Sequence, residues 1–551
     1  MKPAPLGPDG HINPVEGYLA LVLHAHLPFI RHPEFENALE ENWLYECITE
    51  CYVPLLLAFD DLAKQGVDFQ LTVSISPTLA SMLTDPLLQS RYRNRLEKLI
   101  ELARKEVRRT RDQSGFNRLA RMYLQRLREV RDAFVHSYRC NLIEAFGHLQ
   151  ELGRIELITT AATHGYLPLL LPDKSAVSAQ VRVGIENYRR LFGRKPRGFW
   201  LPECGYYPGI DQILADNGIR YTVLETHGIT RARPAPQAGV YAPLYCPSGL
   251  AVFGRDPESS RQVWSSVEGY PGDADYREFY RDIAYDLDHD YIAPYVHPDG
   301  IRTDSGLKYY RITGGTGRKK IYRPEAAERK ARIHARHFIS EKQRQINNLI
   351  PAMNRKPVIV APFDAELFGH WWYEGPQWLY HLVSNLSSCA TEHKSLKHPG
   401  RQSTVRMTTL SEYLEEYPSN QLSMPSASSW GSNGSNETWL GRKNDWIYRH
   451  LHGGAEIMKK LAAGHPAARG MVRRALKQAA RELLLAQASD WAFIIKSGPH
   501  RDYAVQRIKT HLLRLIKLRE QIEGGRINKE WLEAIEQQTN IFPDIGYRIF
   551  E

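Results

Sequence analysis

Short apolar runs recur through the first 410 residues, and most are followed by polar or ionisable residues and then by helical spacing. Seven of these runs predict β-strands, at residues 18–23, 68–74, 155–162, 198–203, 220–225, 250–253 and 357–360. Repeated strand-to-helix units are typical of α/β proteins with a parallel sheet. Seven strands with functional residues at their ends further predict closure into a (β/α)7 barrel, a distorted relative of the eight-stranded TIM barrel.

Two stretches carry helical spacing without strand patterns. Residues 86–152 place apolar side chains on one face and many arginines on the other, which predicts an inserted helical domain with a solvated charged face. Residues 411–551 predict a C-terminal all-helical domain that contributes residues to the end of the barrel where the polar strand ends meet. The barrel is then discontinuous and consists of residues 1–85 and 153–410.

Two long connections interrupt the strand-to-helix units. Residues 227–246 are rich in proline and contain two glycines, which predicts a mobile surface loop. Residues 273–323 contain the run Gly314-Gly315-Thr316-Gly317 beside basic residues. A phosphate-binding loop needs a strand before the glycines and a helix after them, and neither pattern is present, so this run predicts an ordinary loop.

Composition narrows the class of protein. The chain has 551 residues, 72 Lys and Arg against 62 Asp and Glu, and six cysteines without paired spacing. A net charge of +10 spread over this length indicates a solvated surface rather than a nucleic-acid partner. Because no apolar run is long enough for a membrane span and the first residues lack a signal-peptide core, we expect a cytoplasmic protein with reduced thiols and no membrane partner.

Glu203 follows a short apolar strand that stops at Pro202. It lies among Trp200, Tyr206 and Tyr207 in the sequence. Aromatic faces beside a carboxylate suit a sugar ring, whose C–H faces stack on π-systems while its hydroxyls need hydrogen-bond partners. The alternative is a glutamate that merely caps the next helix.

Asp364 ends another predicted strand and is followed by several aromatic residues that would raise the pKa of its carboxyl group. A retaining glycosidase needs two carboxyl groups about 5 to 5.5 Å apart, one as nucleophile and one as general acid/base. Glu203 and Asp364 form such a pair if both strand ends share one end of the barrel. The alternative for Asp364 is a helix N-cap, and Glu366 and Glu225 are substitutes for either member of the pair.

Histidines follow two of the predicted strands. His24 and His26 are two residues apart and therefore lie on the same side of a strand, and His164 follows a third strand. Together with Asp364 they could bind zinc, as in metal-dependent mannosidases or deacetylases. That hypothesis leaves Glu203 and its aromatic neighbours without a role.

Five motifs occur in a characteristic order: HAHLPF (24–29), THGYLP (163–168), GFWLPECGY (198–206), APFDAELFGHWW (361–372) and the segment around Trp430 and Trp439. This set resembles glycoside hydrolase family 57, and within it the 1,4-α-glucan branching enzymes, over nearly the whole chain. The resemblance implies a (β/α)7 barrel, an inserted helical domain, a C-terminal helical domain, and a retaining double displacement that uses no metal and no cofactor. Matched by motif, Glu203 is the nucleophile and Asp364 the general acid/base.

The resemblance also implies further contacts with an α-1,4-glucan such as amylose or glycogen. The residues implied are Arg255, Gly272, Trp430, Asp490 and Tyr241, followed by His24, His26, His164 and Trp264. Tyr241 would tip a mobile segment that covers the active site and shields the glycosyl-enzyme from water. Trp439, Trp446 and Trp491 are expected in the core, and residues 392–402 form an added surface loop relative to the family pattern.

Other functions remain open at this point. A 4-α-glucanotransferase or an α-amylase of the same family would share Glu203 and Asp364. A non-catalytic glucan-binding protein would need only the aromatic residues. In each case we expect a monomer in the cytoplasm.

Overall fold

Seven parallel strands form the centre of the protein, and each coincides with a predicted apolar run. The computed structural model describes residues 15–265, 268–314, 319–388 and 405–551. The central strands are β1 (Gly17–Ala25), β2 (Leu71–Ile75), β3 (Ile155–Thr160), β4 (Phe199–Trp200), β5 (Tyr221–Leu224), β7 (Ala251–Gly254) and β8 (Val358–Asp364). Because they are parallel, their C-terminal ends meet at one end of the structure.

The seven strands close into a ring. One sheet runs β4-β3-β2-β1-β8, and β5 pairs with β7 in a second sheet. Isolated parallel bridges join the two sheets, between Gly198 and Tyr221 and between Arg255 and Val360. A Cβ atom on Gly198 would lie 2.3 Å from the Tyr221 ring, so only glycine permits the first bridge. The predicted (β/α)7 barrel is confirmed in a distorted form.

Three short strands extend the sheets. β9 (Val405–Met407) pairs with β1, and β10 (Gln421–Leu422) pairs with β6 (Leu244–Tyr245), which itself runs antiparallel to β7. Strand pairing therefore continues past residue 410, where the sequence predicted helices alone.

Helices surround the barrel and fill the sequence between its strands. The longer ones are α2 (Val53–Lys64), α8 (Lys174–Phe192), α14 (Pro324–Leu349) and α15 (Gly375–Ser388). Shorter ones are α1 (Glu41–Cys47), α3 (Pro77–Leu83), α7 (Leu167–Leu170), α9 (Ile210–Asp216), α10 (Thr226–Thr230), α11 (Pro257–Trp264), α12 (Ile283–Asp286), α13 (His289–Ile292) and α16 (Leu410–Glu416). Within the described ranges, no helix combines the length and the apolar character that a membrane crossing requires.

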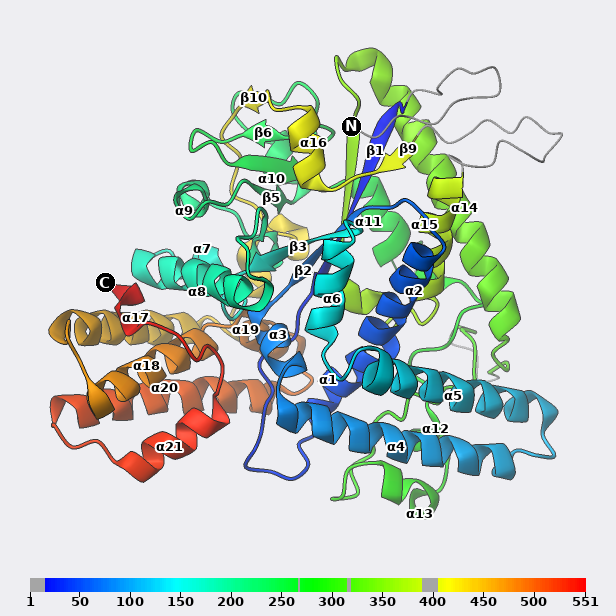
Figure 1. The fold of residues 1–551 in the computed structure, drawn as a ribbon, viewed down its shortest axis with the longest axis horizontal. Helices are drawn as coiled ribbons and strands as arrows, with labels where there is room; N and C mark the ends of the chain where they lie inside the picture. The colour runs from blue at the N-terminus through cyan, green and yellow to red at the C-terminus, as the bar shows by residue number, and fades with distance from the viewer. Residues whose placement is uncertain (1–14, 266–267, 315–318, 389–404) are drawn as a thin grey trace.

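Two helical groups flank the barrel (Figure 1). The insertion contains α4 (Pro86–Arg109) and α5 (Ser114–Asp132), which pack on each other, and α6 (Leu142–Glu151), which packs on β3 and α2. The C-terminal helices are α17 (Trp446–Gly464), α18 (Gly470–Ala486), α19 (Ser489–Ser497), α20 (Arg501–Glu523) and α21 (Lys529–Gln538). Helices α17, α18 and α20 pack together, and α19 packs on α20.

The connection 227–246 differs from its prediction as a mobile surface loop. It contains most of α10 and the strand β6, and the side chains of Val240, Ala242, Leu244 and Cys246 are buried. These apolar residues anchor the segment despite its prolines. Two other predicted loops, residues 392–402 and Gly315 to Gly317, lie outside the described residues.

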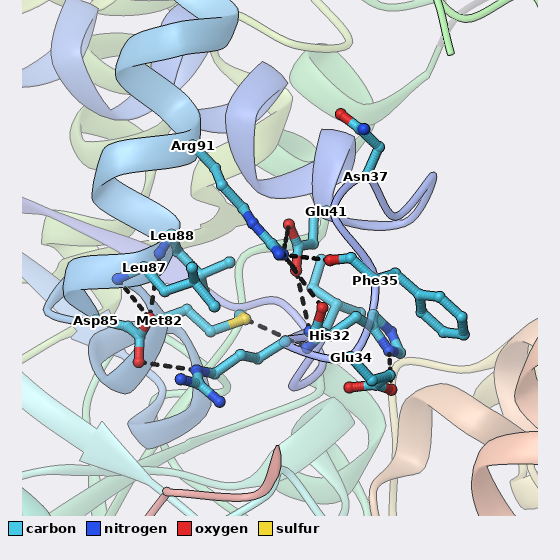
Figure 2. Close-up of polar contacts among 12 residues, drawn as sticks. His32, Glu34, Phe35, Asn37, Glu41, Met82, Asp85, Leu87, Leu88 and Arg91 are labelled. Carbon is cyan, nitrogen blue, oxygen red and sulfur yellow. Dashed lines mark hydrogen bonds and ion pairs between the residues drawn. The ribbon is translucent and has the colours of Figure 1, made fainter. Parts of the chain in front are cut away.

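A buried ion pair holds the loop that leaves β1 (Figure 2). Arg91 Nη1 of α4 donates to both carboxylate oxygens of Glu41, at 2.8 and 2.9 Å, and the backbone N–H of His32 donates to Glu41 Oε1 at 3.0 Å. Arg91 also donates to the carbonyl oxygens of His32 and Phe35. The Glu41 side chain is only 1% exposed, so it depends on Arg91 for charge compensation.

Replacement of Glu41 by alanine should lower the free energy of unfolding by about 3 to 5 kcal/mol, because it leaves the largely buried Arg91 charge unpaired. Denaturant unfolding of the purified protein measures this change. The control is Asp112→Ala, since the Arg111–Asp112 pair is 79% and 85% exposed and should contribute about 0 to 1 kcal/mol. Equal effects of the two substitutions would contradict the role assigned to the Glu41–Arg91 pair.

Candidate active site

Glu203 lies just beyond β4 in a strained turn. It is the middle residue of the 3-10 turn η3 (Pro202–Cys204), with a φ of 60°, and the φ of Cys204 is 52°. Two consecutive non-glycine residues in the left-handed region are unfavourable and are maintained only where surrounding contacts impose them. One such contact is the backbone N–H of Trp430, which donates to the Glu203 carbonyl oxygen at 3.0 Å.

The Glu203 carboxylate receives one hydrogen bond on each oxygen. Trp430 Nε1 donates to Oε2 at 2.7 Å, and the Ser489 hydroxyl donates to Oε1 at 3.1 Å. The side chain is 17% exposed, and its pKa is raised overall by burial and by the charge of Asp490, whereas the hydrogen bonds from Trp430 and Ser489 and the charge of His26 limit that rise. The two donors therefore favour an ionised and oriented carboxylate.

Asp364 is the last residue of β8 and lies in register with His24 of β1. It precedes the 3-10 turn η7 (Ala365–Leu367), but its side chain makes no capping hydrogen bond. Burial raises the pKa of Asp364 well above its usual value, and the charges of Glu366 and Glu203 raise it further, while Arg255 opposes them. A carboxyl group that keeps its proton near neutral pH can serve as a general acid.

Glu366, one of the two substitute carboxylates, is held by fixed contacts. Its Oε1 accepts hydrogen bonds from the backbone N–H of His26 at 3.1 Å and from the Tyr52 hydroxyl at 2.6 Å. Tyr52 belongs to the π-helix η1 (Ile48–Tyr52) between α1 and α2, a kind of irregularity that is frequent at functional sites. Glu366 therefore fixes the loop after β8 and places a carboxylate beside Asp364.

Glu225, the other substitute, pairs with Arg255. Arg255 Nη1 donates to Glu225 Oε2 at 2.8 Å, and the backbone N–H of Thr226 donates to Glu225 Oε1 at 3.0 Å. The Arg255 guanidinium also lies 5.5 Å from the centre of the Trp430 ring. This pair brings the ends of β5 and β7 to the same group of residues as Trp430.

His24 and His164 are buried and directly hydrogen-bonded. Their Nε2 atoms are 3.0 Å apart, His24 Nδ1 is 3.0 Å from the Ser74 hydroxyl, and His164 Nδ1 is 2.9 Å from the Ser489 hydroxyl. The His24 ring also stacks on Trp200, with ring centres 4.9 Å apart. Burial, together with the nearby charge of His26, lowers the pKa of both rings well below the usual value, so both are neutral.

His26 has the opposite electrostatic character. Its Nε2 lies 3.1 Å from both carboxylate oxygens of Asp490, and its Nδ1 lies 2.9 Å from the Ser76 hydroxyl. Burial lowers its pKa, but the charges of Asp490, Glu203 and Glu366 outweigh burial and raise it overall. The His26–Asp490 pair joins the barrel to α19 of the C-terminal helices.

The side chains that could share a metal ion differ from the predicted zinc set. In the described part of the chain, ligand atoms of His26, His164 and Asp490 lie within 4.8 Å of one another. This group contains Asp490 in place of Asp364 and lacks His24. All four ring nitrogens of His26 and His164 already face hydrogen-bond partners, so the arrangement is that of a hydrogen-bonded network.

The structure does not bring Tyr241 to this group. The backbone N–H of Val358, the first residue of β8, donates to the Tyr241 carbonyl oxygen at 2.9 Å. Asp364 lies six residues further along β8, roughly 20 Å away at about 3.3 Å per residue. The Tyr241 hydroxyl accepts a hydrogen bond from Gln345 of α14 at 3.1 Å. In this conformation the tyrosine therefore does not cover Glu203, because the buried residues around it anchor its segment.

Trp264 and Gly272 are two other predicted glucan contacts. Trp264, at the end of α11, is 39% exposed, and its ring centre is 6.3 Å from that of Trp430. Gly272 ends the 3-10 turn η4 (Tyr270–Gly272), where Tyr270 packs against Trp378, and its contact with glucan stays a prediction. Trp439 and Trp491 are each 1% exposed, as expected for core residues, whereas Trp446 is only partly buried.

The sequence did not predict four polar residues of this group. Ser74 and Ser76 lie at the end of β2 as His24 and His26 lie at the end of β1, and this parallel spacing could have indicated them. Ser489 directly precedes Asp490, which was predicted as a glucan contact. Tyr52 lies in a helical stretch and had no distinguishing signal.

Comparison with protein families gives two matches along the chain. Residues 20–425 match the family described as Glycosyl hydrolase family 57. Residues 450–550 match the family described as 1,4-alpha-glucan branching enzyme, C-terminal. The second match includes Ser489 and Asp490, the two residues of α19 that contact Glu203 and His26.

Individual relatives cover nearly the whole chain. A 1,4-alpha-glucan branching enzyme from Thermococcus kodakarensis is 33% identical over 96% of this chain and 78% of its own length. The crystal structure of the alpha-amylase AmyC from Thermotoga maritima has a TM-score of 0.89 and 41% identity, over 97% of this chain and 99% of its own. That of a GH57-type branching enzyme from Pyrococcus horikoshii has a TM-score of 0.85 and 32% identity, over 97% of both chains.

Glu366→Gln should lower the pKa of Asp364, because it removes the neighbouring charge that raises that pKa most after burial. A general acid at this position would then lose its proton at lower pH, so the alkaline limb of the kcat profile should move to lower pH. Glutamine keeps an oxygen that can accept from His26 and Tyr52, so the loop should hold. A pH profile of activity on amylose measures the shift. An unchanged alkaline limb would exclude Glu366 as the cause of the raised Asp364 pKa.

Proposed function

The chain belongs to glycosyl hydrolase family 57, and from this membership we propose that it is a 1,4-α-glucan branching enzyme. It cleaves an α-1,4-glucan and transfers the released segment to a glucan 6-hydroxyl, which creates an α-1,6 branch. The observation that carries the proposal is the contact between the nucleophile candidate Glu203 and Ser489, because Ser489 lies in the segment that matches the branching-enzyme C-terminal family.

The first half of the reaction forms a glycosyl-enzyme. Glu203 attacks the anomeric carbon with an electron pair of its carboxylate, and the bond from that carbon to the glycosidic oxygen breaks. Asp364 gives its proton to the departing oxygen, which leaves as the hydroxyl of the remaining glucan. The raised pKa of Asp364 supports this role, since the group must be protonated at the start.

The second half returns both acids to their starting states. The ionised Asp364 accepts the proton of a glucan 6-hydroxyl, and the hydroxyl oxygen attacks the anomeric carbon. The ester bond to Glu203 breaks, and its electron pair returns to the carboxylate. Trp430 and Ser489, which donate to the two Glu203 oxygens, stabilise the charge that reappears there.

The glucan chain has aromatic surfaces next to these acids. Trp430 lies beside Trp264, whose side chain is 39% exposed, and both rings can stack on pyranose faces. Arg255 and Asp490 border the same region and can hydrogen-bond hydroxyl groups. Asp490 is already bonded to His26, so a sugar hydroxyl would join an existing pair.

Hydrolysis, as in an α-amylase, is the second candidate. It is favoured by the position of Tyr241, which leaves the glycosyl-enzyme without the predicted cover against water. The 41% identity with the alpha-amylase AmyC supports the same alternative. Both functions use Glu203 and Asp364 in the same first half-reaction and differ only in the acceptor.

Incubation with amylose separates the candidates by their products. Branching creates α-1,6 linkages that a debranching enzyme releases, and it leaves the number of reducing ends unchanged. Hydrolysis adds one reducing end for each bond cleaved, whereas a 4-α-glucanotransferase produces neither signal. We expect debranchable linkages to exceed new reducing ends, and the reverse ratio would assign the enzyme to hydrolysis.

Glu203→Gln and Asp364→Asn should each lower activity by roughly a thousandfold or more, since each removes a group that acts in both half-reactions. A covalent glucosyl adduct trapped in the wild-type enzyme should map to Glu203 by mass spectrometry. Glu415→Gln, which changes a carboxylate that is 54% exposed, is the matched control and should retain full activity. An adduct on another residue would refute the assignment of the nucleophile.

A further inference from the structure

Five side chains form an unbroken line of hydrogen bonds that ends on the Glu203 carboxylate. The line runs from Ser74 to His24 (3.0 Å), His24 to His164 (3.0 Å), His164 to Ser489 (2.9 Å) and Ser489 to Glu203 (3.1 Å). The four residues before Glu203 are at most 2% exposed, so they are shielded from bulk water. Each group must therefore find its donor or acceptor within the line.

The direction of every bond follows from the charge of Glu203. An ionised carboxylate only accepts, so Ser489 donates its one proton to Glu203 and must accept from His164. The proton of the neutral His164 ring is then on Nδ1, and its Nε2 accepts from His24. His24 carries its proton on Nε2, which leaves its Nδ1 to accept from Ser74. One arrangement of protons satisfies all four bonds while Glu203 is ionised.

Ser489 is also fixed through its backbone. Its N–H donates to the carbonyl oxygen of His164 at 3.1 Å, and Ala488 forms an antiparallel bridge with Gly165. The start of α19 is therefore docked on the loop after β3, and the Ser489 hydroxyl has little freedom to turn away from Glu203.

We propose that Ser489 is a positioning residue for the catalytic nucleophile, and that His24 and His164 hold its hydroxyl in the donating orientation. The inference rests on the proposed role of Glu203. Ser489 contacts the nucleophile rather than the reacting sugar, and it comes from the C-terminal helices rather than from the barrel. The two buried histidines then act as neutral hydrogen-bond relays with defined tautomers.

Removal of the Ser489 hydroxyl changes no charged group around Glu203. Asp490 raises the pKa of Glu203, while Trp430 and the charge of His26 lower it, and His164 faces the carboxylate at 3.8 Å in its neutral form. Glu203 and Asp364 also interact by charge. A change caused by Ser489→Ala therefore reports the lost donor rather than a lost charge.

The test compares pH profiles of kcat/KM for wild type and Ser489→Ala. Loss of a donor to the ionised form raises the pKa of Glu203, so the acid limb should move to higher pH. We expect kcat/KM to fall about 10- to 100-fold, with KM nearly unchanged and slower formation of the trapped adduct. Ser489→Thr keeps a hydroxyl and should restore the wild-type acid limb.

Two further variants separate positioning from packing. Ser497→Ala lies on the same helix and removes a hydroxyl that donates to the Ile494 carbonyl oxygen, so its acid limb should match the wild type. Ser74→Ala removes the first donor of the line, three bonds away from the last one, and should move the acid limb in the same direction but less.

A folded Ser489→Ala enzyme with an unchanged acid limb would overturn the inference. If this variant does not fold, Ser489→Cys, which keeps a weak donor of similar size, should shift the acid limb in the same direction. An unshifted acid limb in Ser489→Cys would also overturn the inference. Mapping the wild-type adduct is independent of these results. An adduct on Glu203 with no shift refutes only the role of Ser489, whereas an adduct elsewhere refutes the proposed function.

Discussion

A carboxylate loses favourable hydration when it is removed from water, and both acids at the end of this barrel are mostly buried. The two carboxyl groups have different neighbours. Burial and the charge of Asp490 raise the pKa of Glu203, but a hydrogen-bond donor on each oxygen, from Trp430 and Ser489, opposes that rise and favours the ionised form. Asp364 has like charges as neighbours, which favours its protonated form. Environments that separate two otherwise similar acids in this way are how one site obtains a nucleophile and a proton donor at the same pH.

The register of the parallel strands fixes which side chains surround these acids. β1 pairs with β2 on one side and β8 on the other, and this places Ser74 and Asp364 opposite His24. A slip of one residue in either pairing would turn the polar side chains to the other face of the sheet. The short β4 pairs with β3 on one side and joins β5 on the other through the bridge at Gly198, and the strained turn of Glu203 follows directly after it. The least regular part of the barrel therefore carries the nucleophile candidate.

The strands and the positions of Glu203, Asp364 and the histidines were predictable because an apolar run followed by polar residues is a local signal. The partners of these residues were less accessible. No local pattern connects Ser489 with Glu203, since their contact arises only when α19 docks on the loop after β3. Composition also misled in one place, because prolines and glycines around Tyr241 indicated a mobile loop while a few buried apolar side chains anchor it. The neutral state of His24 likewise depends on burial that only the folded chain provides.

The contact of α19 with the barrel also determines when the site can exist during synthesis. The seven barrel strands are complete by Asp364, and Trp430 is translated after them, but Ser489 and Asp490 leave the ribosome later still. Chains grow from the N-terminus at about 5 to 20 residues per second, and domains fold as units in that order. The strands of the barrel are therefore translated several seconds or more before the helix that completes the surroundings of Glu203. Until then, a growing chain should have no mature catalytic centre with which to act on glucan.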